Sequence, residues 1–453
     1  MSLILPADFQ HRMQHTLGNQ WANFEKALHS PPPVSVRYHF LKEIKRQENF
    51  EKVKWSSKGV YLSERPVFTL DPALHAGAYY VQEASSMLVE AAVRQLCDLG
   101  SPLRALDLAA APGGKSTLLA DLLGMKGLLL ANEVIRPRYQ VLRHNLARWG
   151  YPNTCSSNHD SRDLSALGAW FDLLLLDAPC SGEGLFRKDP DAVQEWSPEA
   201  LRLCTARQRR ILADAAGLLR PGGILIYSTC TYHEEENAEN VRWMAREFGF
   251  EEAPLHIPAD WGIQEVQPGY QCYPHRVRGE GFYLACLRKV GENPRRTEDK
   301  TGKIRGWEPL PPKWLPQVGK WLAQPDEYRF FIDTQQNVRA LPKPIEPWTA
   351  TLSQTLYRMD WGIEVGCLKG QDLVPAPELA LSLAVSKELP AVALDRTNAL
   401  LFLKKETISA PHAPQGWTLV RHQGLNLGWA KVLKDRVNNY YPKNWRILMN
   451  LQD

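Results

Sequence analysis

The segment LRALDLAAAPGGKST, residues 103–117, joins an apolar run to a small-residue turn and then to a helical pattern. Residues 103–108 are mostly apolar, as in a buried strand, and residues 115–124 have the apolar spacing of a helix. Gly113 and Gly114 allow the backbone between them to approach a ligand, and the first N–H groups of the helix are free to bind an anion. The segment therefore predicts a strand, a tight turn and a helix start that bind a nucleotide-like ligand.

A phosphate-binding P-loop is one interpretation of this turn. Its motif is G-x-x-x-x-G-K-[ST], and Gly114, Lys115 and Ser116 match the end of it. However, Ala109 occupies the position of the first glycine, and Pro112 has no backbone N–H to offer a phosphate. The match to a P-loop is incomplete.

The other interpretation is a site for S-adenosylmethionine, in which a neutral small-residue turn packs beside the methionine part of the cofactor. Such a site needs an acidic side chain at the end of the next strand to hold the ribose hydroxyls. The next apolar run, residues 127–131, leads to Glu133, about 20 residues after the turn. Glu133 favours the methyl donor over a P-loop ligand.

Strand-like and helix-like segments alternate from residue 103 to residue 288, which is typical of a doubly wound, largely parallel sheet. We expect strands at 103–108, 127–132, 153–157, 172–177, 223–229, 250–254 and 281–288. Helices are expected near 115–124, 136–149, 198–219 and 234–248, and another from about Glu83 within 75–96. The fold class predicted is α/β, with a Rossmann-like S-adenosylmethionine-dependent methyltransferase core.

Five parts are expected along the chain. A helical pattern over 7–30 predicts helices at the start of an N-terminal extension. The segment 291–316 is rich in charge, Gly and Pro, which is typical of a linker. After it, strand-like runs at Tyr328–Ile332 and Ala399–Leu403 predict β-rich modules. The expected bounds are 1–74 for an RNA-binding extension, 75–290 for a catalytic domain, 291–316 for the linker, 317–385 for a small domain and 386–453 for an RNA-binding module.

Basic and aromatic side chains are interleaved in both flanking parts, a combination that suits single-stranded nucleic acid. A solvated charged face remains an alternative for the first of them. The N-terminal group is Arg37, Lys42, Lys45, Arg46, Lys52, Lys54, Lys58 and Arg65 with Tyr38, Phe40, Phe50, Trp55 and Tyr61. The C-terminal group is Arg421, Lys431, Lys434, Arg436, Lys443 and Arg446 with Trp429, Tyr440, Tyr441 and Trp445.

The composition is that of a globular protein, with 44% apolar and 23% charged residues and a formal net charge of +4. The eight cysteines form no C-x-x-C pair, so neither a zinc site nor a disulfide framework is indicated, and no metal is expected. No apolar run reaches the ~18 residues of a membrane span. A cytoplasmic protein without a membrane partner is expected.

Two cysteines follow the ends of predicted strands. The apolar run 171–176 ends at Asp177, with Cys180 shortly after it, and the run 223–229 leads directly to Cys230. Because the carboxyl ends of parallel strands meet at one edge of the sheet, both thiols are expected in one cleft. A buried cysteine that serves only as a small apolar residue is the alternative.

Paired thiols suit methylation of cytosine at C5, a carbon that is not nucleophilic enough by itself. Attack of a thiolate on C6 makes C5 nucleophilic, C5 takes the methyl group, and loss of the C5 proton expels the enzyme. A protonated Asp177 can donate to cytosine N3, Asp160 can accept from the adenine amino group, and Lys115 can contact Asp177 or a phosphate. The chemistry alone does not choose between Cys180 and Cys230 as nucleophile.

Residues 75–288 resemble the catalytic core of the Nol/Nop/Sun family of RNA cytosine-C5 methyltransferases. The matching segments are HAGAYYVQEASS (75–86), LDLAAAPGGK (106–115), NE (132–133), LDAPCSGEG (176–184) and YSTCTYHEEEN (227–237). LGWAKVLKDRVNNYYPKNWRI (427–447) is similar to the tail of bacterial ribosomal RNA methyltransferases of the RsmF type, which includes a PUA-like RNA-binding module. The resemblance implies 5-methylcytosine formation in RNA, with 16S rRNA or the small ribosomal subunit as partner. A monomer is the simplest expectation for the oligomeric state, which the sequence does not reveal.

The same resemblance assigns the site residues. Cys230 is implied as the nucleophile, Cys180 as the residue that assists product release, and Asp177 as a contact to both cofactor and base. Contacts to S-adenosylmethionine are implied for Ala109, Ala110, Ala111, Pro112, Gly113, Gly114, Lys115, Glu133, Asp160 and Asp177. Two rival functions remain: a catalytically silent RNA-binding assembly factor and a P-loop-like ATP-dependent enzyme.

Overall fold

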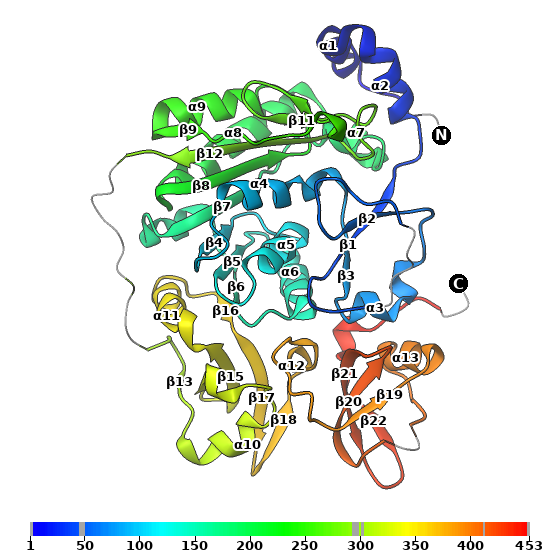
Figure 1. Ribbon diagram of the computed structural model, residues 1–453, viewed down its shortest axis with the longest axis vertical. Coiled ribbons are helices and arrows are strands. Elements are labelled where there is room, and N and C mark those ends of the chain that lie inside the picture. Colours follow the sequence, from blue (N-terminus) through cyan, green and yellow to red (C-terminus); the bar gives the residue numbers. More distant parts are fainter. Residues whose placement is uncertain (1–2, 45–49, 292–298, 300–302, 411–412, 451–453) are drawn as a thin grey trace.

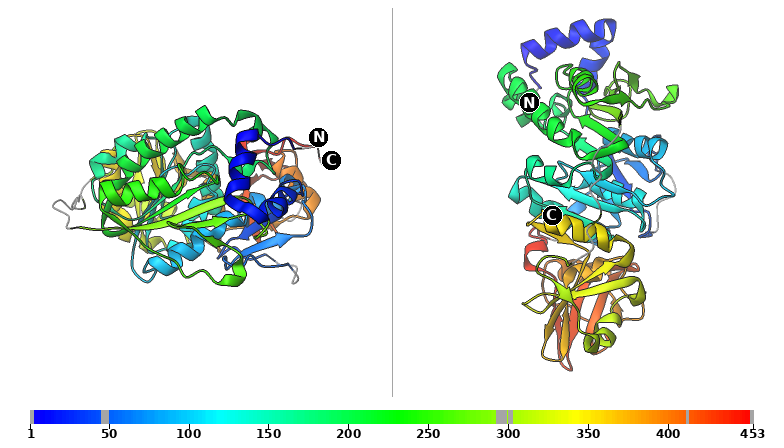
Figure 2. Two further views of the ribbon diagram at one scale, coloured as in Figure 1. Left: turned by 90° about the horizontal axis from the view of Figure 1, so that it is seen from above. Right: turned by 90° about the vertical axis from the view of Figure 1, so that its left-hand side faces the viewer.

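The computed structural model describes residues 3–44, 50–291, 299, 303–410 and 413–450. The molecule is elongated, with two N-terminal helices at one end, the largest sheet in the middle and two smaller sheets beside each other at the other end (Figure 1). The right-hand view of Figure 2 shows the same succession along the long axis. No helix in these ranges combines the length and apolarity that crossing a membrane requires.

The central sheet contains ten strands. They are β4 (Arg104–Asp107), β5 (Leu128–Asn132), β6 (Thr154–Ser157), β7 (Phe171–Asp177), β8 (Leu219–Thr229), β9 (Phe250–Glu252), β10 (Gln264–Glu265), β11 (Tyr270–Cys272), β12 (Phe282–Lys289) and β16 (Met359–Trp361). Their order is β10-β11-β12-β8-β7-β4-β5-β6-β16, with β9 beside β12. The five strands from β8 to β6 are parallel, which confirms the predicted doubly wound α/β core. Their carboxyl ends therefore share one edge of the sheet.

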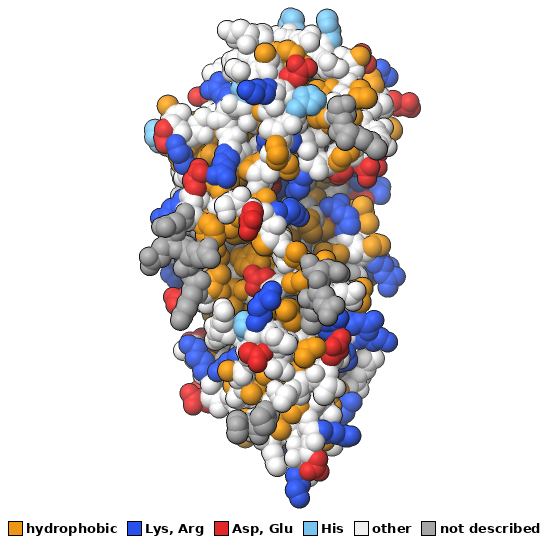
Figure 3. All heavy atoms as spheres, turned by 90° about the vertical axis from the view of Figure 1, so that its right-hand side faces the viewer, with side chains coloured by type: hydrophobic (Ala, Val, Ile, Leu, Met, Phe, Trp, Pro, Cys, Tyr) orange, Lys and Arg blue, Asp and Glu red, His pale blue; other side chains and the backbone are white. Residues whose placement is uncertain are grey.

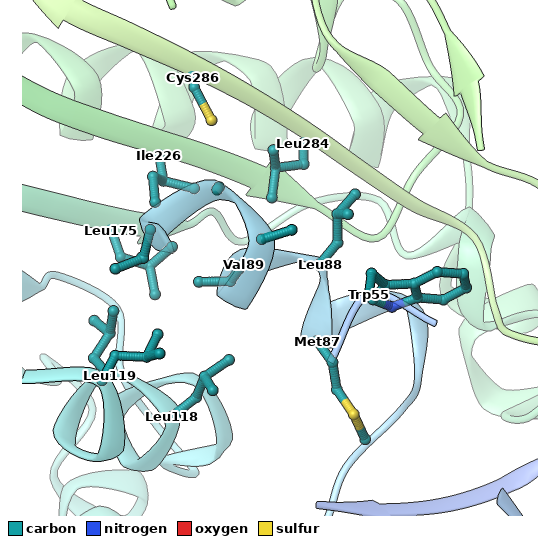
Figure 4. Packing of buried hydrophobic residues seen from close by; sticks show 14 of the residues in the cluster. Trp55, Met87, Leu88, Val89, Leu118, Leu119, Leu175, Ile226, Leu284 and Cys286 are labelled. Atoms are coloured by element: carbon teal, nitrogen blue, oxygen red, sulfur yellow. The ribbon is translucent and has the colours of Figure 1, made fainter. Parts of the chain in front are cut away.

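Successive side chains of a strand point to opposite sides, so the apolar strands present apolar side chains on both faces of this sheet. Helices cover both faces. In β7, Leu175 belongs to the same buried cluster as Leu118 and Ile226, whereas Leu174 clusters with Leu212. Figure 4 shows the first of these clusters at close range. The helices of the catalytic region are α4 (Leu88–Leu96), α5 (Gly114–Leu123), α6 (Arg136–Trp149), α7 (Pro190–Glu195), α8 (Pro198–Ala216) and α9 (Ala238–Phe248).

The helical lead-in predicted over 7–30 is confirmed as two helices, α1 (Ala7–Leu17) and α2 (Trp21–Leu28). The chain turns at Gly18, whose φ of 53° is costly for residues with a side chain. A sheet of three antiparallel strands follows, in the order β2-β1-β3. Its elements are β1 (Val34–Tyr38), β2 (Gly59–Leu62) and β3 (Tyr79–Val81), with the short helix α3 (Pro72–His75) before β3.

Much of the basic and aromatic segment 36–65 lies in the core and not on an open nucleic-acid surface. Arg37 is 0% exposed, and Tyr38, Trp55 and Tyr61 are buried. The ammonium group of Lys42 donates to the carbonyl oxygens of Ala76 and Arg148, at 2.9 and 2.6 Å. The prediction of RNA contacts is therefore wrong for these five residues of the segment, while Lys45 and Arg46 lie outside the described residues.

Two smaller sheets follow the central one. The first has the order β13-β14-β15-β17-β18 and the second β19-β20-β21-β22. Their strands are β13 (Glu308–Pro309), β14 (Tyr328–Ile332), β15 (Asn337–Pro342), β17 (Ile363–Lys369), β18 (Asp372–Pro375), β19 (Ala391–Ala393), β20 (Gly416–His422), β21 (Leu425–Val432) and β22 (Val437–Asn439). The helices among them are α10 (Leu315–Gly319), α11 (Glu346–Thr355), α12 (Pro377–Leu381) and α13 (Arg396–Leu403).

The predicted strand at Ala399–Leu403 is wrong, because this run is the second half of α13. Asp395 begins the helix by accepting a hydrogen bond from the backbone N–H of Asn398 at 2.7 Å. The region predicted as a linker also contributes structure, since β13 pairs with β14. In addition, β16 pairs with β6, so a strand that follows the predicted catalytic domain extends its sheet. The five domain bounds remain predictions.

Candidate active site

The turn between β4 and α5 is held from behind by α6. Asn145 donates to the carbonyl oxygen of Pro112 at 2.6 Å, and Arg138 donates to that of Ala111 at 2.7 Å. Gly113 has a φ of 110°, and a Cβ on Gly114 would lie 3.3 Å from the Tyr80 ring. The positive φ favours glycine at position 113, and the nearby Tyr80 ring leaves little space for a side chain at position 114.

The same turn differs from a phosphate cradle. The N–H of Ala110 is donated to the carbonyl oxygen of Asn132 at 2.8 Å, and Pro112 has none to offer. Lys115, which would reach a phosphate in a P-loop, instead lies 2.7 Å from Asp177. Ala110, Pro112 and Lys115 therefore do not offer a phosphate the donors that the P-loop interpretation requires of them.

Asp107, at the end of β4, is a candidate that the sequence analysis missed. Its Oδ2 accepts a hydrogen bond from Ser116 at 2.6 Å, while Oδ1 is buried and has no partner among the described residues. Burial raises the pKa of Asp107 to about 7. Its position directly before the glycine turn was the available signal, since strand-end carboxylates face the ligand in such folds.

Glu133 follows β5, as predicted, and is 2% exposed. Its Oε1 accepts from the backbone N–H of Ile135 at 2.8 Å, and its Oε2 lies 3.8 Å from Arg138. Asn158, beyond the end of β6, donates to the carbonyl oxygen of Glu133 at 2.7 Å. The Glu133 side chain is thus held by the start of α6, and its backbone is held by the loop after β6.

Asp160 follows β6, the strand three positions away from β7 in the sheet, and is therefore displaced along the sheet edge from Asp177. Its carboxylate pairs with Arg210 at 2.8 Å and with Arg162 at 3.1 Å. Burial works against the charge, but hydrogen bonds from these two arginines lower the pKa of Asp160 overall. The ring of His159, the residue before Asp160, packs edge-on against the Tyr357 ring with centroids 4.7 Å apart. The region after the predicted linker therefore also reaches the carboxyl edge of the sheet.

Asp177 ends β7 and lies between two donors. Lys115 contacts its Oδ2 at 2.7 Å, and Ser228 of β8 donates to its Oδ1 at 2.7 Å. Burial disfavours the ammonium form of Lys115, but attraction to Asp177 and Asp107 raises its pKa overall. Lys115 and Asp177 therefore form an ion pair at the centre of the edge.

The two predicted cysteines face each other beside this pair. Their sulfur atoms are 3.2 Å apart, and the N–H of Cys230 lies 3.3 Å from the Cys180 sulfur. The hydrogen bond to Cys230, together with burial, raises the pKa of Cys180 well above its usual value. The two thiols therefore lie within hydrogen-bond distance of each other, and the Cys180 sulfur also accepts from the backbone N–H of Cys230.

The elements that carry these side chains end on the side of the molecule that faces right in Figure 1. Figure 3 looks at that side and shows a hollow at mid-height with hydrophobic side chains in its floor. A parallel sheet whose carboxyl edge combines a glycine turn, fixed acids and a pair of free thiols defines the class of this protein: an α/β protein with a site for a nucleoside cofactor next to two cysteines.

Comparison with known proteins narrows this class. Residues 100–288 match the family described as 16S rRNA methyltransferase RsmB/F, residues 5–84 the N-terminal domain of 16S rRNA methyltransferase RsmF, and residues 389–447 the methyltransferase RsmF PUA domain. Ribosomal RNA small subunit methyltransferase F of Aliivibrio fischeri is 30% identical, with 98% of each chain covered. The protein of that name from Salmonella arizonae is 43% identical over 81% of this chain and 78% of its own.

Solved structures agree with these matches. A methyltransferase homolog from Pyrococcus horikoshii superposes with a TM-score of 0.55 at 31% identity, over 64% of this chain and 96% of its own. NSun6 from the same organism shares the fold, with a TM-score of 0.53 at 23% identity over 63% of this chain and 99% of its own. This chain belongs to the RsmF family of ribosomal RNA methyltransferases.

The residues at the sheet edge fit S-adenosylmethionine, the methyl donor of this protein. The unpartnered oxygen of Asp107 matches a cationic group such as the methionine ammonium, and the Glu133 carboxylate matches ribose hydroxyls. A Cβ on Gly113 would lie 3.2 Å from Leu142 and one on Gly114 3.3 Å from Tyr80, so the glycines keep this turn free of side chains. The assignments of Ala109 to Lys115, Glu133, Asp160 and Asp177 as cofactor contacts remain predictions.

Proposed function

We propose that this protein methylates C5 of a cytosine in 16S rRNA through a covalent bond between Cys230 and C6. The observation that carries the proposal is the 3.2 Å approach of the Cys180 and Cys230 sulfur atoms at the ends of neighbouring strands. The Lys115–Asp177 pair lies beside them, next to the cofactor turn. The names of the relatives support rRNA as substrate.

Cys230 is the nucleophile in this proposal. Its thiolate forms a bond to C6, and the electron pair of the C5–C6 double bond makes C5 reactive. When bound, S-adenosylmethionine supplies an electrophilic methyl group for C5. Loss of the C5 proton to water then restores the double bond and breaks the bond between C6 and Cys230.

The Lys115–Asp177 ion pair assists formation of that adduct, and Cys180 assists its breakdown. Negative charge that develops on the ring during attack is offset by a proton to N3, which Lys115 supplies through Asp177 and takes back on release. When the Cys230 sulfur departs, the Cys180 thiol donates a hydrogen bond to it. The target base must be unpaired or flipped into the cleft, because C5 of a stacked base is out of reach.

The proposed function is tested by incubating the full-length protein with S-adenosylmethionine carrying a labelled methyl group and 16S rRNA transcribed in vitro. Mass spectrometry of the digested RNA should find the label in 5-methylcytosine. Label in another nucleoside would overturn the cytosine assignment. Binding of RNA without transfer, to the free transcript and to the small subunit alike, would favour the silent assembly factor.

Replacing Glu133 by alanine should weaken the binding of S-adenosylmethionine by about 10- to 100-fold, since hydrogen bonds to a charged group contribute roughly 1.5–3 kcal/mol. Isothermal titration calorimetry of the cofactor measures the change directly. Glu265, which is exposed on β10, provides the matched control, and its alanine variant should bind as the wild type does. Equal affinity of Glu133→Ala and wild type would show that Glu133 does not hold the ribose.

Asp177→Asn should slow formation of the covalent adduct by about 100-fold or more, the usual contribution of a positioned acid or base. The amide cannot relay a proton from Lys115 to N3. Rapid-quench measurement of the protein–RNA adduct separates this step from later ones. An unchanged rate of adduct formation would contradict the role proposed for the Lys115–Asp177 pair.

A further inference from the structure

Two buried glutamates occupy the loops that carry the thiols. Glu183 follows Cys180 in the first loop, and Glu236 follows Cys230 in the second. Both are 0% exposed, and neither takes part in the chemistry described above. A buried carboxylate is tolerated only where donors satisfy it, so the partners of each acid show what it holds together.

Glu236 reaches from the Cys230 loop to the residue next to Cys180. Its Oε1 accepts from the backbone N–H of Ser181 at 2.9 Å, and its Oε2 accepts from the Ser181 hydroxyl at 2.5 Å. Gln208 of α8 donates to Oε1 at 2.8 Å and also to the carbonyl oxygen of Pro179 at 2.9 Å. The backbone on both sides of Cys180 is thereby tied to the opposite loop.

Glu183 makes the reciprocal connection, from the Cys180 loop to the Cys230 loop. Its Oε2 accepts from the backbone N–H of Tyr232 at 3.2 Å. Its Oε1 accepts from Trp196 at 3.1 Å and from Arg12 of α1 at 2.5 Å. The N-terminal helix therefore contributes a charge to the interior of the cysteine loops.

The two loops also meet backbone to backbone. The N–H of Gly184 donates to the carbonyl oxygen of Cys230 at 2.8 Å. A Cβ on Gly184 would lie 2.4 Å from the carbonyl oxygen of Gly281 and 2.9 Å from that of Cys230, so a side chain at this position would displace the loop from both. Around them, Phe9 of α1 packs against Phe186 and Tyr232, with ring centroids 5.0 and 6.3 Å apart.

We propose that Glu236 and Glu183 are positioning residues that set the distance between the two thiols, and that Arg12 of the N-terminal helix completes the Glu183 connection. This inference rests on the proposed function. Release of the product is the step that depends on the distance, because Cys180 must reach the Cys230 sulfur as it leaves C6. Formation of the adduct needs only Cys230 of the two thiols.

The test compares Glu236→Ala with Glu236→Gln in the full-length protein on 16S rRNA. The alanine variant should release the adduct about 10- to 100-fold more slowly, the effect of a misplacement of about 1 Å, and the adduct should accumulate. Glutamine keeps an acceptor for both N–H groups and can donate to Ser181, so it should restore release. Binding of S-adenosylmethionine and the rate of adduct formation should stay near wild type in both.

Ser181→Ala provides a second variant that removes one donor and leaves the buried acid in place. It should slow release in the same direction by a smaller factor. If cofactor binding, adduct formation and release all fall together, both glutamates have only a general structural role, and the proposal is overturned. Failure of the wild type to make 5-methylcytosine would instead contradict the proposed function itself.

Arg12→Ala extends the test to the N-terminal helix. Loss of its charge leaves Glu183 without its ion partner, so the adduct should again accumulate while cofactor binding is unchanged. Arg246 is the matched control, because its ion pair with Glu247 lies on the exposed face of α9 and its side chain is 69% exposed. If Arg12→Ala and Arg246→Ala release the adduct at equal rates, Arg12 and the N-terminal helix have no part in setting the distance between the thiols.

Discussion

Cys180→Ala should leave the protein covalently joined to its RNA, whereas Cys230→Ala should form neither the adduct nor 5-methylcytosine. In the proposed mechanism Cys230 supplies the sulfur that bonds to C6, so no other step can begin without it. We propose that Cys180 acts after methyl transfer, where its thiol assists departure of the Cys230 sulfur across the 3.2 Å that separates them. Removing Cys180 should therefore block breakdown of the adduct but not its formation.

The expected loss of methyl transfer in Cys230→Ala is about 10⁴-fold or more, as for essential nucleophiles in other enzymes. Denaturing gel electrophoresis detects the protein–RNA adduct, and mass spectrometry of the RNA detects the product. Cys367 is a matched control, since it lies on β17 of a different sheet. If Cys230→Ala traps RNA and Cys180→Ala does not, the roles of the two thiols are exchanged.

Arg37→Ala should destabilise the protein by about 3–5 kcal/mol, the cost of breaking a buried ion pair. The Arg37 guanidinium on β1 lies 2.5 Å from Asp121 of α5, and both side chains are 0% exposed. It also donates to Gln82 at 2.9 Å and to Thr117 at 2.7 Å. Its removal would leave the Asp121 carboxylate uncompensated between the N-terminal sheet and the helix that begins at the cofactor turn.

Urea unfolding followed by tryptophan fluorescence measures this effect. Arg65 belongs to the same basic segment but is exposed, and Arg65→Ala should change stability by no more than about 0.5 kcal/mol. The double variant Arg37→Ala, Asp121→Ala should recover part of the loss, because no buried charge remains unpaired. Similar stabilities for Arg37→Ala and Arg65→Ala would contradict the structural role of this arginine.

Local patterns predicted seven of the ten strands of the central sheet, and they located acids and cysteines that the structure places after its strands. Strand-length apolar runs, a glycine turn and strand-end acids depend on neighbours in the sequence, and this is why Glu133, Asp177, Cys180 and Cys230 were recognisable before any packing was known. The same patterns failed at Ala399–Leu403, where an apolar run of that length suits a strand or a buried helix equally well, and the cap at Asp395 selects the helix.

The sequence by itself determined the doubly wound core, the cofactor turn and the cysteine pair, because each depends on spacing along the chain. Only the tertiary structure decided which charges are buried, since Arg37 and Arg65 look alike in the sequence and differ in what packs over them. It also joined β16 to the central sheet and brought Arg12 to Glu183, contacts between residues far apart in the chain. Such contacts have no local signal, because their energy comes from desolvation and long-range packing that exist only in the folded molecule.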